Sequence, residues 1–521
     1  MRDAFTSLFA MKCFLLLLLS ATCTLAEVRL PSVISDHMVV QAGKPVAIWG
    51  WAAAGEEIVV QFTGQKKTAK TSAKGEWQVK LDPLAPSMES HELRVQSTVI
   101  KDVLVGEVWL ASGQSNMAMQ INGKLHGKVD NADAEVAAAK HPEIRVFVHD
   151  APLAIYELPV PADAPALDRP GKWRVCSPET VADFSAMGYF FARDLLAEIK
   201  HPIGILTSAV GGTPIEAWTS REAQMGVPEF KPLLDDWAKR LDGFVPELEQ
   251  KKFLDAKAAW LKTRSAAIKT KKTAPKAPSP FKNLQVMKPG GLYASMIAPL
   301  VPYTIRGVIW YQGERNAAGP FTGLYGAQLQ TLIADWRSRW GDEFYFAWVQ
   351  IPAFATPQKF PSEPTGWGVS VRDGQRRALR VPHTGMAITM DIGDPKQGHT
   401  ANKTEFAARL SRVVLHDVYQ KSIDLWSGPL FKSAEVAADH ITLTFDQASG
   451  LKARSGKLEG FAIAAEDKKF VWADARIEGD KVIVSSAEIK APKAVRYSWA
   501  ANPKGNLVNA ANLPASPFSS E

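Results

Sequence analysis

The stretch that decides the fold is residues 106–119, GEVWLASGQSNMAM, where an apolar run stops abruptly at small and polar residues. Residues 107–111 have the character of a buried strand, and Ser112-Gly113-Gln114 has the character of a turn. Ser115 follows this turn at once. The turn is either an ordinary connection or a means of presenting Ser115 to a bound molecule, and the rest of the chain has to decide between the two.

The middle of the chain contains several such apolar segments, and helical stretches separate them. In the helical stretches the apolar residues recur every three to four positions, as on one face of a helix. We expect strands at residues 107–111, 203–208, 305–311, 344–351 and 386–390, with helices such as 187–200 and 325–339 between them. This alternation predicts a parallel sheet with helices on both faces.

Both flanks of this region differ from it. Residues 28–104 and those from about 425 onward consist of short alternating segments separated by turns, which is typical of β-sandwiches. We expect an N-terminal β-module (27–103), an α/β domain (104–424) and a C-terminal β-module (425–521). An insertion at about 230–290 begins with a charged helical pattern and continues as an exposed Lys/Pro-rich loop over residues 269–282.

The N-terminus has the pattern of a secretory signal. Residues 14–19 are FLLLLL, and the small residues Thr24 and Ala26 fit a cleavage site, so residues 1–26 predict a signal peptide and export to the periplasm or the outside. The apolar run is far shorter than the ~20 residues of a membrane span. A lipid anchor on Cys23 is a second interpretation, although the residue before it fits poorly. Cleavage would leave Cys176 alone, without a disulfide partner.

The formal net charge of the chain is +7, and its lysines cluster between residues 251 and 276. A basic cluster indicates either an exposed helix face or a nucleic-acid or anionic surface. No aromatic-interleaved RNA motif or DNA-reading helix accompanies this cluster, so we expect a solvated face and no nucleic-acid partner.

Polar residues follow four of the expected middle strands. In a parallel α/β sheet, ligands bind beyond the carboxyl ends of the strands, so these clusters should meet on one edge. The clusters are Ser112-Gly113-Gln114-Ser115-Asn116, Gly211-Gly212-Thr213, Gln312-Gly313-Glu314-Arg315-Asn316, and Asp391-Ile392-Gly393-Asp394 with His399.

Together these clusters contain what ester cleavage by a serine requires. Ser115 is a weak nucleophile that needs a base, and His399 titrates near neutral pH and can be that base. Hydrogen-bond donors must stabilise the negative charge that develops on the attacked carbonyl oxygen. The backbone N–H of Ser115, that of Gly212 or Gly211, and the side chain of Asn316 fit this role, because glycine lets the backbone approach a substrate closely.

The strings GQSNMAM, SAVGGTPIEAWTS, GVIWYQGERNA and DIGDPKQGHTANKTEF resemble the sequence blocks of the sialate O-acetylesterases, in the SGNH (GDSL-like) hydrolase superfamily. RLPSVISDHMVVQ, KPGGLYASMIAPL and AVRYSWAANPKGNL extend the resemblance over nearly the whole chain. It implies a three-layer α/β/α flavodoxin-like domain flanked by β-sandwich-like modules, and removal of O-acetyl groups from sugars without a metal or cofactor. It also implies Ser115 as nucleophile, His399 as base, and an oxyanion hole completed by Gly212 and Asn316.

The chain departs from the family pattern in two blocks. Arg315 stands where the third block usually has serine, and it either binds an anionic substrate group or points away. The last block has Gly398-His399-Thr400 in place of Ile-His-Pro. Related hydrolases often place an orienting Asp three residues before the histidine, where this chain has Lys396. We expect Asp394 to orient His399; Asp391 or a backbone carbonyl, which would leave a Ser-His dyad, are the alternatives.

Four further residues are candidates for substrate binding. Gln114 either bonds to substrate or fixes the turn before Ser115, and Gln312 and Glu314 lie in the third block. Arg372 either contacts substrate or organises a loop from a buried position.

The expected function is exported carbohydrate O-acetylesterase activity on sialic acid or related sugars, through a serine acyl-enzyme. One alternative keeps the chemistry but changes the substrate to a plant or algal polysaccharide such as acetylxylan. A second is a non-catalytic glycan-binding protein, which predicts loss of Ser115, His399 or the glycine turns, and all of these are present.

Overall fold

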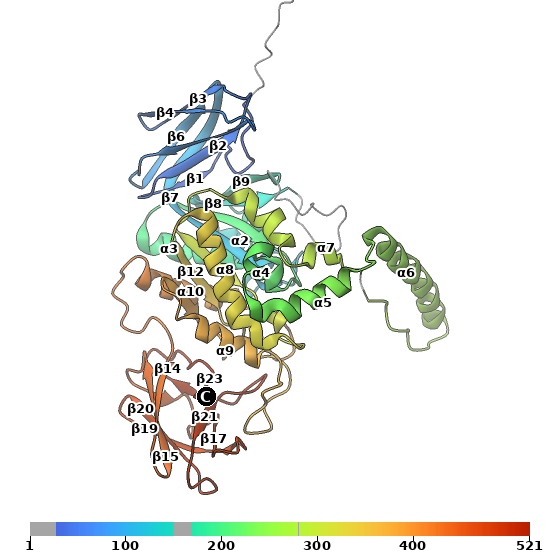
Figure 1. Ribbon diagram of the computed structural model, residues 1–521, viewed down its shortest axis with the longest axis vertical. Coiled ribbons are helices and arrows are strands. Elements are labelled where there is room, and N and C mark those ends of the chain that lie inside the picture. Colours follow the sequence, from blue (N-terminus) through green and yellow to red (C-terminus); the bar gives the residue numbers. More distant parts are fainter. Residues whose placement is uncertain (1–27, 151–167, 280) are drawn as a thin grey trace, which may run out of the picture.

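The computed structural model describes residues 28–150, 168–279 and 281–521, so the expected signal peptide with Cys23 lies outside the described residues. Its centre is a sheet that lies between the N-terminal and C-terminal β-structures (Figure 1). The strand order of this sheet is β13-β12-β11-β7-β10-β8-β9. All neighbouring pairs on this path are parallel except β8 and β9. The strands are β7 (Thr98–Gly113), β8 (His141–His149), β9 (Gly171–Cys176), β10 (Ile203–Ala209), β11 (Gly307–Tyr311), β12 (Tyr345–Val349) and β13 (Thr384–Ala387).

Both faces of this sheet are buried. Successive side chains of a strand point to opposite faces, so neighbouring residues enter different hydrophobic cores. In β7, Val108 and Leu110 belong to one hydrophobic core, and Trp109 and Ala111 belong to another. The first core includes residues of α8 (Tyr325–Trp340), and the second includes residues of α3 (Ala186–Ile199) and α10 (Lys403–Asp417). The chain is therefore an α/β protein with helices on both faces of a mixed central sheet. Further α-helices of this region are α1 (Ser115–Ala118), α2 (Ala132–Ala138), α4 (Arg221–Met225), α7 (Leu284–Met287) and α9 (Val369–Ala378).

Strand β7 is shared between the central sheet and the N-terminal β-structure. Over its first half it pairs with β6 and β1, and over its second half with β10 and β11. A single strand of 16 residues therefore runs from the N-terminal sheet to the turn before Ser115. The other N-terminal strands are β1 (Val39–Gln41), β2 (Val46–Trp51), β3 (Glu57–Phe62), β4 (Gln65–Lys70), β5 (Glu76–Leu81) and β6 (Ser87–Val95).

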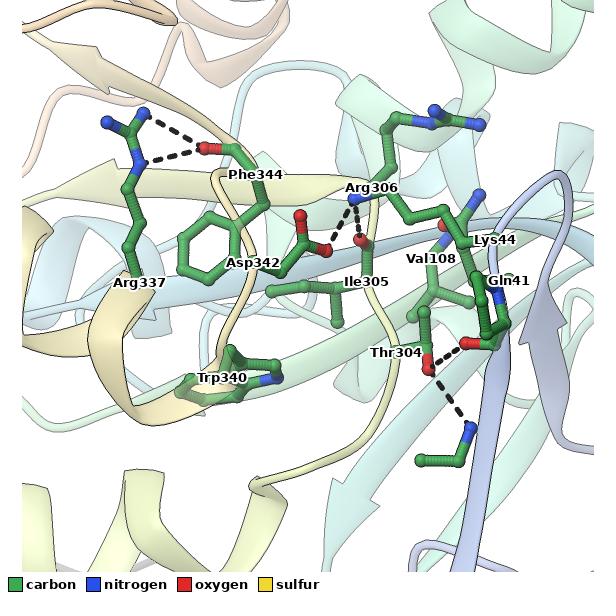
Figure 2. A network of polar contacts seen from close by, with 12 residues as sticks. Gln41, Lys44, Val108, Thr304, Ile305, Arg306, Arg337, Trp340, Asp342 and Phe344 are labelled. Carbon is green, nitrogen blue, oxygen red and sulfur yellow. Dashed lines mark hydrogen bonds and ion pairs between the residues drawn. The ribbon is translucent and has the colours of Figure 1, made fainter. Parts of the chain in front are cut away.

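Polar contacts reinforce this junction. Figure 2 shows the Lys44 ammonium between the carbonyl oxygen of Ile305, at 3.1 Å, and the carboxylate of Asp342, at 2.6 Å. The Thr304 hydroxyl donates a hydrogen bond to the carbonyl of Pro45 just before β2. The N-terminal strands are therefore held to the loops that lead into β11 and β12.

The C-terminal part contains two four-stranded antiparallel sheets around one core, at the red end of the chain (Figure 1). One has the order β14-β15-β20-β19 and the other β18-β17-β21-β23, and β16 pairs with β22. The core unites Leu443 and Val484 of the first sheet with Ile463 and Val495 of the second. The strands are β14 (Leu430–Val436), β15 (His440–Asp446), β16 (Lys452–Ala453), β17 (Phe461–Ala464), β18 (Val471–Trp472), β19 (Asp474–Glu478), β20 (Lys481–Ser485), β21 (Ala494–Tyr497), β22 (Leu507–Val508) and β23 (Phe518–Ser519).

Two helices occupy the segment expected as an insertion. Helix α5 (Lys231–Leu241) packs Leu233 and Trp237 onto the body, whereas α6 (Pro246–Lys269) projects away from it (Figure 1). Among the described residues, no helix is both long and apolar enough to span a bilayer.

The central strands lie where the sequence predicts them, to within a few residues at each end, with two differences. Strands β8 and β9 were not expected, and they extend the sheet beyond β10. Strand β7 also begins well before residue 107, because the expected strand is only its second half.

Candidate active site

The turn after β7 places Ser115 at the start of helix α1. Gly113 has φ +139°, and a Cβ there would lie 2.2 Å from the Tyr311 carbonyl oxygen, so the close approach of β7 and β11 requires glycine. Gln114 is extended, and Ser115 is the first helical residue rather than the cap. The hydroxyl of Ser115 makes no hydrogen bond to any described residue. Its side chain is therefore not used to cap the helix.

Two histidines and a glycine lie around Ser115. A Cβ on Gly211 would be 3.4 Å from the Cβ of Ser115 and 2.6 Å from His126 Nε2. The rings of His126 and His399 have their centroids 5.2 Å apart. The ends of β7 and β10 and the loop after β13 therefore converge, as the strand-end pattern predicts. His126 was not among the expected residues; it lies in a loop without periodic pattern.

Both imidazoles favour the neutral form. Burial lowers the pKa of His126 to about 4, and the nearby His399 adds to this effect. Burial, and then the positive charge of Lys403, lower the pKa of His399 below its usual value. A neutral imidazole is the form that accepts a proton from a serine hydroxyl.

The backbone around Ser115 offers unpaired donors. The N–H groups of Ser115, Gly211 and Gly212 donate to no acceptor among the described residues. The N–H of Ser115 also belongs to the first turn of a helix, where donors lack partners within the helix. Such donors are what a developing oxyanion requires.

The side chain of Asn316 is held in one orientation. Its Oδ1 accepts hydrogen bonds from the N–H of Ile215, at 3.0 Å, and from Nε2 of Gln312, at 2.8 Å. Its Nδ2 donates to Glu216 at 2.9 Å, and Trp237 donates to the other oxygen of that carboxylate at 3.1 Å. The carboxylate of Glu216 thus engages one amide hydrogen of Asn316, and the other is available to a ligand.

The two glutamines brace the neighbouring turns. Gln114 and Gln312 are buried, and Gln312 Nε2 donates to Gln114 Oε1 at 3.1 Å. Gln114 Oε1 also accepts from the backbone N–H of Arg315 at 3.2 Å, while the Arg315 side chain is exposed. These contacts correspond to a Gln114 side chain that fixes the turn before Ser115, which is one of the two roles that the sequence allows.

A buried polar cluster lies beneath Ser115. The amide nitrogen of Asn116 donates to the Glu314 carboxylate at 2.5 Å and to the carbonyl of Gly398 at 3.0 Å, and its oxygen accepts from Lys403 Nζ at 2.9 Å. Lys403 also donates to the Thr400 carbonyl at 2.6 Å. The cluster thus ties the Ser115 turn to the backbone on both sides of His399. Asn116 and Lys403 lie inside the quoted blocks, but nothing in the sequence assigned them a role.

The electrostatics of this cluster depend on burial. Burial raises the pKa of Glu314, whose Oε2 has no hydrogen-bond partner, and it lowers the pKa of Lys403 to about 7. Glu314 opposes the second shift by attracting the ammonium. Glu314 and Lys403 are thus two buried ionisable groups of this cluster, and each forms a hydrogen bond with Asn116.

The expected orienting carboxylates are engaged elsewhere. Asp394 Oδ1 accepts the backbone N–H groups of Lys396 and Gln397 in its own turn, at 2.8 and 3.2 Å. Asp391 pairs with Arg409, at 2.5 Å. The ring of His399 has no hydrogen bond to Asp394, Asp391 or any other described residue.

Arg372 is fully buried in α9, away from these groups. Its guanidinium donates to the carbonyls of Pro352, Ala500 and Ala501, at 3.0, 2.5 and 3.2 Å. It therefore ties the central part of the chain to the C-terminal strands.

The chain is similar to known carbohydrate esterases. Residues 105–242 match a family described as carbohydrate esterase, sialic acid-specific acetylesterase. The sialate O-acetylesterase of Rattus norvegicus is 29% identical over 544 residues, covering 94% of each chain, and that of Homo sapiens is 28% identical over 519 residues, covering 90% of this chain and 87% of the human one. The crystal structure of a carbohydrate acetylesterase from Xanthomonas citri has 32% identity and a TM-score of 0.75, with 95% of this chain and 99% of that chain covered.

These similarities confirm the family expected from the sequence blocks. The chain belongs to the sialate O-acetylesterase family of carbohydrate esterases and is a carboxylic ester hydrolase.

Proposed function

We propose that this protein is an exported O-acetylesterase that releases acetate from O-acetylated sugars through a Ser115 acyl-enzyme. The observation that carries the proposal is the convergence of Ser115, Gly211, His126 and His399 beside unpaired backbone N–H groups. A serine with a free hydroxyl, a neutral imidazole and a set of free donors are what acyl transfer requires.

In the first half of the reaction, His399 takes the proton of the Ser115 hydroxyl as Oγ attacks the acetyl carbonyl carbon. The carbonyl π electrons move to the oxygen, which the N–H groups of Ser115 and Gly212 and the free amide hydrogen of Asn316 stabilise. The tetrahedral intermediate collapses, the bond to the sugar oxygen breaks, and the sugar leaves with the proton from His399.

In the second half, His399 takes a proton from water as the water oxygen attacks the acetyl-serine. The second tetrahedral intermediate collapses by breaking the bond to Ser115 Oγ, which regains the proton from His399. Acetate and the free serine result, so one ester and one water give one alcohol and one acid.

We propose a Ser-His dyad in place of a triad. The Asp394 carboxylate accepts hydrogen bonds in its own turn, whereas Asn116 and Lys403 bind the backbone on both sides of His399. In this proposal the cluster under the serine positions the imidazole, and Gln114, Gln312 and Glu314 shape the site without touching substrate. Arg372 does not touch substrate either and acts as a structural tie.

We also propose three further features of the molecule. They are the flavodoxin-like α/β/α arrangement of an SGNH hydrolase within residues 104–424, the β-modules at 27–103 and 425–521, and removal of residues 1–26 on export. The substrate is proposed as an O-acetylated sialic acid or a related sugar. Acetylated polysaccharide remains the second candidate, because the Xanthomonas citri protein is described as a carbohydrate acetylesterase without a named sugar.

The test compares Ser115→Ala with the unaltered protein, using hydrolysis of an aryl acetate and acetate release from a panel of O-acetylated sialic acids and polysaccharides. We expect loss of all turnover with an unchanged unfolding midpoint. Undiminished turnover in Ser115→Ala would refute the acyl-enzyme, and the ranking of the panel identifies the sugar. Asp394→Ala tests the dyad: a loss of more than about tenfold in kcat would restore the triad.

A further inference from the structure

Helix α6 is an exposed arm for which the proposed reaction has no use. It has 24 residues, none of them buried, and it projects from the body beyond α5 (Figure 1). A helix that buries no face against its own protein gains little from tertiary packing, which usually supplies most of a helix's stability. This makes α6 a candidate for a surface that is covered by something else.

The C-terminal two-thirds of α6 carries an apolar stripe. Leu254, Leu261 and Ile268 recur every seven residues, with Ala258 and Ser265 between them, so they lie along one line of the helix. The three large side chains are 54%, 43% and 56% exposed. They are among the few large apolar side chains that the described part of the chain leaves exposed.

Two rows of cations border this stripe. At 3.6 residues per turn, Lys257 and Arg264 lie along one edge, and Lys262 and Lys269 lie along the other. None of these four forms an ion pair with a described residue. Residues 256–282 hold eight Lys and Arg and no Asp or Glu, which leaves the remainder of the chain at −1 out of a total of +7.

The chain that returns from α6 covers a different side of the helix. The indole N–H of Trp260 donates to the carbonyl of Pro275 at 2.8 Å. Trp260 lies about 80° around the helix from Ile268, the nearest residue of the stripe. It lies beside Arg264, whose guanidinium is 5.6 Å from the centre of the indole ring. The return segment therefore lies beside the row of Lys257 and Arg264, while the large side chains of the stripe and all four cations stay exposed.

We propose that this face of α6 binds flat on an anionic lipid surface. The apolar stripe enters the boundary between headgroups and acyl chains, and the two rows of cations contact the lipid phosphates on either side. A second copy of the chain fits less well, because pairing two such faces would bring cations against cations. An anionic polysaccharide would engage the cations but leave the leucines in water.

The test is co-sedimentation of the full chain with vesicles of phosphatidylcholine alone or mixed with phosphatidylglycerol. We expect binding only to the mixed vesicles, and weaker binding as salt is raised. Each surface cation contributes about a fivefold change in partitioning, so Lys262→Glu with Lys269→Glu should lower it at least about 20-fold. Leu261→Gln with Ile268→Gln should lower it as well, because the stripe loses its insertion.

The matched control is Lys469→Glu with Lys481→Glu, which makes the same charge change on two exposed lysines of the C-terminal part, one in a loop and one in β20. It should bind as the unaltered protein does. All variants should keep their aryl acetate turnover, because α6 is outside the site. Equal binding to both vesicle types, or undiminished binding of the α6 charge variant, would overturn the proposal. A third outcome would assign this face to polysaccharide: the protein binds polygalacturonate but not vesicles, and Leu261→Gln with Ile268→Gln leaves that binding unchanged. A dimer that these substitutions dissolve would assign it to a second copy.

Discussion

Asn116→Ala tests whether the cluster beneath the serine positions the histidine. The substitution removes hydrogen bonds to Glu314, Gly398 and Lys403, at 2.5, 3.0 and 2.9 Å. A hydrogen bond to an ionisable group contributes about 1.5–3 kcal/mol and a neutral one about 1 kcal/mol. Because the three share one side chain and are not additive, we expect a loss of about 2–4 kcal/mol in the free energy of unfolding.

The same substitution should reduce catalysis beyond its effect on stability. Gly398 immediately precedes His399, so without Asn116 the loop loses a hydrogen bond next to the proposed base. A displacement of about 1 Å at a reacting group can cost about 100-fold in rate, so we expect kcat to fall about 10- to 100-fold with a smaller change in KM.

The assay pairs aryl acetate kinetics with urea unfolding. Asn506→Ala is the matched control: its side chain also makes three hydrogen bonds, to the backbone of Ser455, Lys457 and Glu459 in the C-terminal part. That variant should lose stability and keep its kcat. If Asn116→Ala unfolds more easily but turns over at the original rate, the cluster supports only the fold and the positioning argument is wrong.

Three other substitutions test separate parts of the structure. Lys403→Met removes the positive charge that adds to burial in lowering the pKa of His399, so the acid limb of the pH profile of kcat/KM should move to higher pH; an unmoved limb would contradict the coupling. Because the pKa of Lys403 is lowered to about 7 in the fold, the unfolded chain binds the extra proton above that pH. As the pH rises from about 7 to about 10, the free energy of unfolding of the unaltered protein should therefore increase relative to that of Lys403→Met. Urea unfolding at several pH values measures this difference. Trp237→Phe removes the donor that holds the carboxylate behind Asn316, and kcat should fall several-fold while KM changes little, whereas equal changes in both would indicate a binding defect. Arg372→Met leaves three buried carbonyls without their donor and should cost about 3–5 kcal/mol in unfolding free energy, and a loss below 1 kcal/mol would contradict its role as a tie.

The strands of the central sheet could be predicted because each is a continuous apolar run that ends in a polar turn. Residues 203–208 and 386–390, for example, lie within one or a few residues of β10 and β13. Strands β8 and β9 escaped prediction for a local reason. They are an antiparallel pair joined by a long connection rather than by a tight turn, so no hairpin signal marks them.

Some features of the candidate site could likewise be predicted from the sequence, and others could not. The meeting of Ser115, Gly211 and His399 follows from the parallel order of the strands, which brings their carboxyl ends to one edge. His126 could not be foreseen, because a loop residue shows its neighbours only after the chain has folded. The contacts of Asp394 could not be predicted either. Its spacing from His399 does not reveal that the carboxylate accepts the N–H groups of its own turn.

The continuity of β7 makes the N-terminal β-structure part of the same cooperative unit as the serine turn. A cut between the two would have to pass through a strand that is hydrogen-bonded on both sides of the cut. Truncation at residue 103 should therefore remove the pairing that anchors one end of the strand whose other end carries Gly113. Heating should melt the two regions in a single transition, and an exchange of N-terminal modules between relatives would have to preserve the register of β7 residue by residue.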